Sequence, residues 1–228
     1  MAGEGGIEVS WLGRMSFDDG LRLQEESVAA GPGAPERLLL LEHDPVFTTG
    51  RGGDPANRPD PDGPFGGVPL RRVGRGGDAT FHGPGQLVGY ALLDFEARGG
   101  DAHRLLRALE GGLIDLLATR GLVAGRVAGR TGVWVGSPGE IPRKIAAIGV
   151  GVRRGRSMHG FALNVSIDLA PFAAIVPCGI EGVVTTSLAA EGLRPIPTVR
   201  EVALDAARTL PRAIEDRLPR LAAPAEAP

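Results

Sequence analysis

The sequence predicts a two-layer α+β fold, in which a mixed, largely antiparallel sheet is flanked by helices in one domain over residues 1–218. Several strand-like apolar runs lie between two long helical segments, without the regular βαβ alternation of a doubly wound parallel sheet. The chain has 228 residues, 43% hydrophobic and 23% charged, as expected for one large globular domain. Its 36 glycines and 19 prolines indicate many tight turns rather than a helical bundle.

The N-terminal part begins with a strand and a helix. IEVSWLGRM predicts the strand, and Ser16 is an N-cap for a helix from about Phe17 to Ala30, which GPG closes. RLLLLEH predicts a short apolar strand, and QLVGYALLDF predicts another. Between them, residues 51–69 are rich in Gly, Pro and Asp and predict a long surface loop.

Two more helices are predicted in the rest of the chain. Asp101 caps a helix through AHRLLRALEGGLIDLLATR that ends at Gly121. Thr198 starts a C-terminal helix, in which Pro211 predicts a break or kink. Residues 219–228, which include APAEAP, predict a disordered tail. Strand-like runs lie between the two helices, at residues 122–128, 131–135, 144–152 and 158–165.

Composition excludes several classes of protein. The net charge of −2 indicates no general basic surface, so nucleic acid is not an expected partner. No apolar run approaches the ~18 residues of a membrane span, and MAGEGGIEVSW lacks the features of a signal peptide. The single cysteine cannot form an internal disulfide, which fits a reducing cytoplasm. We expect no metal, because the four histidines show no ligand spacing.

Lys144 is the only lysine among 25 basic residues. A guanidinium stays protonated in proteins, whereas an ammonium group can transfer a proton. Lys144 opens the apolar run from Ile145 to Val152, which predicts a buried strand followed by the exposed residues Arg153 and Arg154. This setting favours a chemical role for Lys144, with a stray, solvated surface charge as the alternative.

Cys178 carries the only thiol of the chain, within VPCGIEGVVTTSL. Pro177 and Gly179 predict a turn that exposes the thiol and leaves the backbone N–H groups of Gly179 and Ile180 free. A thiol beside free N–H groups suits attack on a carbonyl next to an oxyanion hole. An inert core cysteine is the alternative, and these residues alone do not say whether a His or a Lys would be the base.

Two glycine-containing segments predict a ligand pocket. GRGGDATFHGPGQLVGY has six glycines, so its backbone can approach a ligand lined by Arg75 and His82, or it forms a turn between two strands. In SMHGFALNVS, Gly160 and Ala162 alternate with larger residues. This pattern leaves a slot for a linear apolar ligand or allows close strand–helix packing. Enlarging Gly160 is therefore expected to shorten the accepted ligand while the fold stays intact.

Four motifs in this order resemble the lipoyl(octanoyl) transferase family, over roughly residues 38 to 190. They are RGG…T…HGPGQLV at 75–88, KIA…IGV at 144–150, HG.ALNV at 159–165 and PCGI.G…TSL at 177–188. Two departures are Phe81, where the family usually has tyrosine, and Ala91, where it often has proline. The resemblance implies the catalytic-domain fold shared by biotin and lipoate ligases.

The resemblance also implies which residues form the active site. Cys178 would form a thioester, and Lys144 would be its catalytic partner. Backbone N–H groups of the HGPG loop or of Gly179 would hold the oxyanion. The implied substrate-binding residues are Arg75, Gly76, Gly77, Asp78, Ala79, Thr80, Phe81, His82, Ala147, Ile148, Gly149, Gly160, Phe161 and Ala162.

The implied reaction moves an octanoyl group from octanoyl-acyl carrier protein to the lysine of lipoyl domains, as the first step of endogenous lipoate biosynthesis. The acceptors would be the lipoyl domains of 2-oxoacid dehydrogenase complexes and the glycine cleavage H protein, in the cytoplasm. No membrane or nucleic acid would take part. No cofactor would be needed, because the substrate carries phosphopantetheine on the acyl carrier protein. Alternatives are an ATP-dependent lipoate or biotin ligase, a thioesterase and a non-catalytic acyl-binding module. The acidic lipoyl domains and acyl carrier protein would bind a local basic surface, for which the candidates are Arg71, Arg72, Arg153, Arg154 and Arg156. The alternative is that these arginines are solvated charges without a partner.

Overall fold

The computed structural model describes residues 6–137, 139–175 and 183–221. Its main sheet contains β1 (Glu8–Met15), β2 (Arg37–His43), β6 (Gln86–Leu92), β7 (Gly125–Val127), β8 (Arg130–Val135), β9 (Arg143–Arg153), β10 (Arg156–Asn164) and β11 (Val184–Thr185). The strands follow the order β1-β2-β6-β10-β9-β8-β7, and β11 pairs with β9. The β1–β2 and β9–β11 pairs are parallel and the others antiparallel, so the predicted mixed, largely antiparallel sheet is confirmed.

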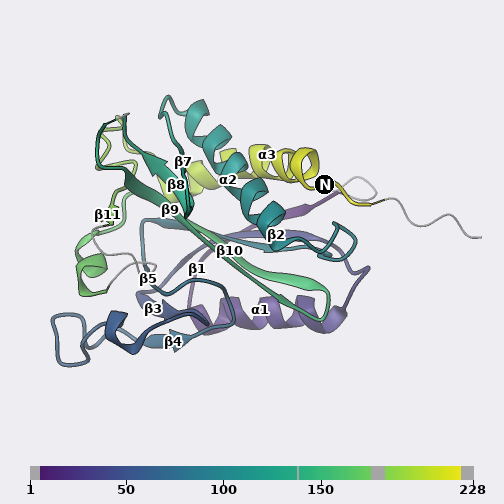
Figure 1. The fold of residues 1–228 in the computed structure, drawn as a ribbon, viewed down its shortest axis with the longest axis horizontal. Coiled ribbons are helices and arrows are strands. Elements are labelled where there is room, and N and C mark those ends of the chain that lie inside the picture. The colour runs from purple at the N-terminus through teal and green to yellow at the C-terminus, as the bar shows by residue number, and fades with distance from the viewer. Residues whose placement is uncertain (1–5, 138, 176–182, 222–228) are drawn as a thin grey trace, which may run out of the picture.

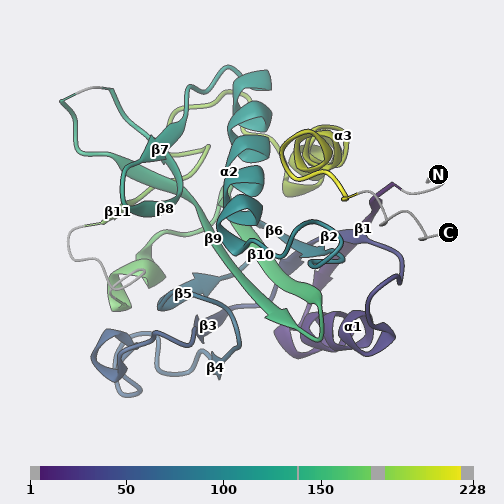
Figure 2. The same ribbon diagram turned by 45° about the vertical axis from the view of Figure 1, so that its right-hand side comes forward.

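Helices cover both faces of this sheet. Helices α2 (Ala102–Thr119) and α3 (Val199–Arg217) lie on one face, where their leucines pack on the sheet in the largest apolar cluster among the described residues. Helix α1 (Phe17–Ala30) covers the other face, as Figures 1 and 2 show. A smaller sheet, made of β3 (Val46–Thr49), β4 (Leu70–Arg72) and β5 (Ala79–His82), lies beside α1 on that same side.

The predicted helix starts are confirmed, because each depends on local capping. The hydroxyl of Ser16 accepts a hydrogen bond from the Asp19 N–H, and Asp101 caps α2. Thr198 forms a capping box with Glu201 at the start of α3.

Helix α3 does not break at Pro211, contrary to one alternative of the sequence prediction. Proline removes one backbone hydrogen bond. However, Leu210, Ala213 and Ile214 are all buried on either side of it, so packing holds the next turn in place. Packing therefore outweighs the local cost of the proline.

The loop at 51–69 is confirmed as a connection without strands, apart from the 3-10 turn Pro55–Asn57. Phe65 and Val68 anchor it on an apolar cluster that includes Phe47, Phe81 and Phe172. The three short strands of the smaller sheet were not predicted.

The described start of the predicted tail contacts the domain, since the Leu221 N–H donates to the Ala97 carbonyl at 2.7 Å. Residues 222–228 lie outside the described part of the chain. Among the helices that are described, none has the length and apolar character needed to cross a membrane.

Candidate active site

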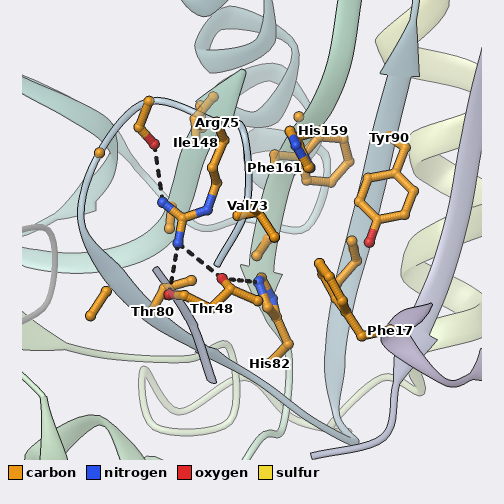
Figure 3. Close-up of a pocket in the computed structure, with 18 residues that line it drawn as sticks. Phe17, Thr48, Val73, Arg75, Thr80, His82, Tyr90, Ile148, His159 and Phe161 are labelled. Atoms are coloured by element: carbon orange, nitrogen blue, oxygen red, sulfur yellow. Dashed lines mark hydrogen bonds between the residues drawn. The ribbon is translucent and has the colours of Figure 1, made fainter. Parts of the chain in front are cut away.

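A mostly apolar pocket lies between the two sheets and holds about 560 Å³ of empty space, its open mouth included. Strands β6, β9 and β10 of the main sheet supply one wall. Strands β3 and β5 and the loop at 73–77 supply the other, and Phe17 at the start of α1 closes one end (Figure 3). The pocket is therefore formed between the main sheet and the smaller sheet, and each of them supplies part of its lining.

Most of the predicted substrate-binding residues line this pocket. They come from three separate segments of the chain and form one continuous surface. These residues are Arg75, Gly76, Gly77, Ala79, Thr80, His82, Ala147, Ile148, Gly149, Gly160, Phe161 and Ala162.

Two predicted residues do not line the pocket. The Asp78 carboxylate accepts hydrogen bonds from the Asn57 side chain and from the Ala79 N–H, so it shapes the turn before β5. The ring of Phe81 packs between Phe47 and Phe172 in the neighbouring apolar cluster. Because Phe81 does not line the pocket, its lack of the hydroxyl group of the usual tyrosine does not change the pocket wall.

Sequence reasoning missed six lining residues: Phe17, Thr48, Val73, Val88, Tyr90 and His159. Val88 and Tyr90 alternate along β6, but every residue of that strand is buried, so periodicity did not mark one face. Phe17 and Thr48 reach the pocket only through tertiary packing. His159 adjoins the glycine at 160 and could have been included with it.

Arg75 ties the pocket loop to the smaller sheet. Its guanidinium donates hydrogen bonds to the carbonyl oxygens of Gly76 and Thr48, both at 3.0 Å, and to the Thr48 hydroxyl at 2.9 Å (Figure 3). The same hydroxyl lies 3.3 Å from His82 Nε2. Arg75 thus lines the pocket and also ties the loop at 73–77 to β3.

A chain of hydrogen bonds runs from His82 through Gln86 and Asn164 to the backbone of Thr186. Gln86 Nε2 donates to the Phe81 carbonyl and to Asn164 Oδ1, and Asn164 Nδ2 donates to the Thr186 carbonyl. Since the Gln86 amide nitrogen faces two acceptors, its oxygen accepts from His82 Nδ1–H at 2.8 Å. The network assigns the proton of neutral His82 to Nδ1, which leaves the Nε2 lone pair facing Thr48.

The imidazoles of the pocket are neutral at neutral pH. Burial, with added repulsion from His43 and Arg75, lowers the pKa of His82 to about 3. Burial and the nearby Arg75 and Arg51 lower the pKa of His159 to about 4. Burial also lowers the pKa of His43, which does not line the pocket but whose Nε2 lies 2.6 Å from the hydroxyl oxygen of Tyr90, a lining residue. These side chains therefore bring no positive charge to a pocket that suits an apolar ligand.

Lys144 lies on β9, with only 5% of its surface exposed, so the alternative of a solvated lysine is wrong. Its Nζ lies 5.1 Å from the centroid of the Trp134 ring. It borders a small pocket that shares Thr80 and Ala147 with the main pocket, and whose other lining residues are Gln86, Asn164, Phe172 and Thr185. The single lysine is thus placed next to the apolar pocket.

Cys178, Gly179 and Ile180 lie outside the described residues, as does the whole segment 176–182. The described residues on its two sides are informative. Phe172 precedes the segment and Thr185 follows it, and both border the small pocket that contains Lys144. Thr185 also pairs directly with Lys144 between β11 and β9.

The HGPG loop offers less to an oxyanion than the resemblance implied. The Gly85 N–H already donates to Glu42 Oε2 at 2.8 Å, and the Gly85 carbonyl accepts from the N–H groups of Val165 and Ser166. Its N–H is therefore engaged in holding the loop, and Pro84 has none to offer.

One of the five predicted basic surface residues is not on the surface. Arg156 is fully buried and donates to the carbonyl oxygens of Ala34, Pro35 and Leu92. The remaining four arginines are exposed, and Arg71 is paired with Asp18 at 2.9 Å. Arg156 serves to satisfy buried carbonyl groups and cannot meet an acidic partner.

Known proteins resemble the chain both in sequence and in fold. A sequence model of the family described as "Lipoyl protein ligase A/B catalytic domain" matches residues 18–208. An octanoyltransferase of Geobacter metallireducens is 49% identical over 220 residues, which are 95% of this chain and 98% of that protein.

Two solved structures share the fold at low sequence identity. A bipartite lipoate protein ligase from Thermoplasma acidophilum, studied with its E2 lipoyl domain, has a TM-score of 0.62 at 21% identity, over 93% of this chain and 84% of that one. The biotin protein ligase of Aquifex aeolicus with biotin and ATP has a TM-score of 0.56 at 15% identity, over 92% and 72%. The predicted biotin and lipoate ligase fold is confirmed.

Proposed function

The chain belongs to the lipoyl protein ligase A/B catalytic domain family and is an acyltransferase of octanoyl groups, and from that premise we propose that the octanoyl group passes through Cys178. The donor is octanoyl-acyl carrier protein, and the acceptor is the lysine of a lipoyl domain. One observation carries the proposal: the chain's only lysine, Lys144, is buried beside the apolar pocket, and Phe172 and Thr185, which flank the chain's only cysteine in the sequence, border the same small pocket.

The apolar pocket is proposed to hold the octanoyl chain. The small side chains of Ala147 and Ala162, on two neighbouring strands, line its wall, and its histidines are neutral. Each methylene group buried there would contribute roughly 0.8 kcal/mol to binding. The pocket thus supports a linear acyl chain as the group that is moved.

In the first half-reaction, the Cys178 thiolate attacks the carbonyl carbon of the donor thioester. A new C–S bond forms to Cys178, and the C–S bond to the phosphopantetheine sulfur breaks. The Lys144 ammonium group donates its proton to the departing sulfur, so the carrier leaves as a thiol. An acyl-enzyme and a neutral lysine remain.

In the second half-reaction, the amine of the lipoyl-domain lysine attacks the acyl-enzyme. A C–N bond forms, the C–S bond to Cys178 breaks, and the proton of the attacking nitrogen passes to the neutral Lys144. The enzyme returns to its starting state with a thiolate and an ammonium group. A thioester is exchanged for a more stable amide, so the proposed reaction consumes no ATP.

Chain connectivity supports the pairing of Cys178 with Lys144. Cys178 is six residues from Phe172 and seven from Thr185, and both border the Lys144 pocket. Thr185 and Thr186 are joined to Lys144 by strand pairing and by a 2.9 Å hydrogen bond from the Thr186 N–H to the Lys144 carbonyl. Described residues on both sides of the thiol in the sequence therefore lie at the site of the lysine.

The proposed acceptors are the lipoyl domains of 2-oxoacid dehydrogenase complexes and the glycine cleavage H protein, which places the reaction in the cytoplasm. A ligase would activate a free acid with ATP and release pyrophosphate. The structural neighbours that bind ATP are similar in fold alone, whereas the relative at 49% identity is an octanoyltransferase. Sequence similarity therefore favours transfer without ATP.

The test is intact-mass analysis after mixing the protein with octanoyl-acyl carrier protein. We expect one octanoyl adduct, which disappears when lipoyl domain is added. Because Cys178 is the only cysteine, Cys178→Ser should form no thioester and lose nearly all transfer, since an alcohol without a Ser-His-Asp arrangement is a weak nucleophile.

Three other outcomes would contradict the proposal. Transfer that needs ATP and releases pyrophosphate would identify a ligase. Rapid loss of the adduct to water without lipoyl domain would identify a thioesterase. Octanoyl binding without an adduct at Cys178 would identify a binding module.

A further inference from the structure

We propose that Gly132 and Trp134 of β8 form a cradle that fixes the Lys144 side chain, which makes them positioning residues for acyl transfer. The inference rests on the proposed role of Lys144. A Cβ atom on Gly132 would lie 2.5 Å from Lys144 Cε, 2.6 Å from the Ala146 carbonyl oxygen and 3.3 Å from Lys144 Nζ. The lysine side chain and the Ala146 carbonyl group therefore occupy the space that a side chain at position 132 would fill.

An irregularity in the β8–β9 pairing creates this space. The register shifts between Val133 and Trp134, so Trp134 lies opposite Lys144. Gly132 has a φ of 125°, a backbone conformation that residues with side chains rarely adopt. Such irregular strand pairs are frequent beside active sites, where they re-aim a side chain.

Helix α2 anchors the irregular backbone from the other side. The buried carboxylate of Glu110 accepts a hydrogen bond from the Gly132 N–H at 3.1 Å. Arg107 and Arg126 pair with the second oxygen of Glu110 at 2.6 and 2.8 Å. Gly132 is thus held by a carboxylate whose two oxygens both have partners.

Trp134 confines the charged end of the lysine. Its ring centroid lies 5.1 Å from Lys144 Nζ, within the range of a cation–π interaction. Trp134 is 3% exposed, and its Nε1 has no hydrogen-bond partner among the described residues. Packing and the cation contact, rather than a hydrogen bond, therefore orient the ring against the lysine.

The cradle has a kinetic consequence. A free lysine side chain loses about 2 kcal/mol of rotamer entropy when it is immobilised. Here folding has already restricted it, so the ammonium group need not be ordered again in each half-reaction. A displacement of about 1 Å can lower a rate about 100-fold, so loosening the cradle should slow both proton transfers while the charge is kept.

The single lysine allows a direct test. Protein grown with 13C-labelled lysine has one labelled side chain, and the Trp134 ring should shift its Hε and Cε signals. Gly132→Ala and Trp134→Leu are expected to move these signals and to slow both half-reactions roughly 10- to 100-fold in single-turnover experiments. Trp134→Phe keeps an aromatic face and should retain most of the rate.

Gly129→Ala is the matched control. Gly129 also has a positive φ, 73°, but a Cβ there would meet no atom within 4 Å. The substitution adds a Cβ atom to a positive-φ glycine in the turn before β8 without displacing the lysine, so both the signals and the rates should stay close to those of the wild type. If Gly132→Ala does not fold, the Trp134→Leu and Trp134→Phe pair still gives the comparison.

Two results would overturn the inference. Unchanged lysine signals in Trp134→Leu and Gly132→Ala would show that the cradle does not hold Lys144. Shifted signals with wild-type rates would show that the held position does not matter for transfer. A separate failure, wild-type rates in Lys144→Ala, would refute the proposed role of the lysine, while the lysine signals of the wild type, Gly132→Ala and Trp134→Leu would still report on the cradle.

Discussion

A Cβ atom on Gly160 of β10 would lie 2.3 Å from the carbonyl oxygen of Gly89 on β6, so the two strands leave no room for a side chain at this position. The contact is with backbone, in a run of five paired residues, so neither partner can move aside without disturbing the pairing of the two strands. The expectation that Gly160 can be enlarged while the fold stays intact is therefore wrong.

Gly160→Ala is predicted to destabilise the protein. Overpacking against backbone costs about 1–3 kcal/mol, so the unfolding midpoint should fall by several degrees. Thermal unfolding of the variant measures this. Gly125→Ala, on the edge strand β7, is the control, because a Cβ there meets no atom within 4 Å. Equal midpoints for the two variants would contradict the crowding at Gly160.

Ala162→Val is predicted to shorten the accepted acyl chain. Ala162 lines the pocket and packs with Val88 and Tyr90, so the added methyl groups should enter the space proposed for the chain. Octanoyl transfer should fall by about tenfold or more relative to butanoyl transfer, as is usual for a filled apolar pocket.

The comparison of kcat/KM for the two acyl carriers measures this selectivity. Ala91→Val is the matched control, since Ala91 is equally buried but belongs to the core against α2 and α3. It should lower stability without changing chain-length preference. Equal losses for both chains in Ala162→Val would mean that the acyl chain lies elsewhere.

Local chemistry explains what the sequence could predict of the fold. Ser16, Asp101 and Thr198 begin their helices through hydrogen bonds within three residues, so the pattern is complete in the sequence. The apolar residues of β9 and β10 also predicted these two strands from the sequence. Strands β3, β4 and β5 have only three or four residues and depend on one another, so no local pattern marks them.

The sequence likewise predicted some features of the site but not those that depend on tertiary packing. The family resemblance identified most of the residues that line the pocket, and the apolar run after Lys144 predicted that this lysine begins a buried strand. However, Tyr90, Phe17 and His43 meet only because α1, β2 and β6 pack together. The Gly132–Lys144 contact depends on a register shift between two strands, and composition carries no signal for it.

The buried histidines predict acid sensitivity. Folding lowers the pKa of His82 to about 3 and of His159 to about 4, whereas an unfolded histidine titrates near 6.5. Between these values the unfolded chain binds more protons than the folded one. The free energy of unfolding should therefore fall as the pH drops from about 7 towards 4, by up to about 1.4 kcal/mol per pH unit for each histidine.

Denaturant unfolding between pH 7 and 4.5 measures this slope. His159→Asn should make it shallower, and asparagine tolerates the left-handed backbone of that position, where φ is 61°. His103→Asn is the control, since His103 lies on the exposed start of α2. If His159→Asn leaves the slope as it is in the wild type and in the control, the buried imidazole of His159 does not account for the acid sensitivity.

Lys144→Arg tests whether the lysine moves a proton. The guanidinium keeps the positive charge but does not give up its proton in proteins. We predict that this variant forms some acyl-enzyme, because a positive charge still favours the Cys178 thiolate, but barely passes the octanoyl group to the lipoyl domain. Lys144→Ala, which loses the charge as well, should be slow in both half-reactions.

Single-turnover kinetics of each half-reaction give the measurement, and Arg153→Lys at the exposed end of the same strand controls for an exchange of the two residue types. The structure adds a steric alternative, because a larger head group must fit between Gly132 and Trp134. If bulk alone mattered, acyl-enzyme formation would fall as much as transfer, whereas a lost proton acceptor slows mainly transfer. Transfer by Lys144→Arg at the wild-type rate would show that the charge is sufficient and that the only lysine of the chain does not shuttle a proton.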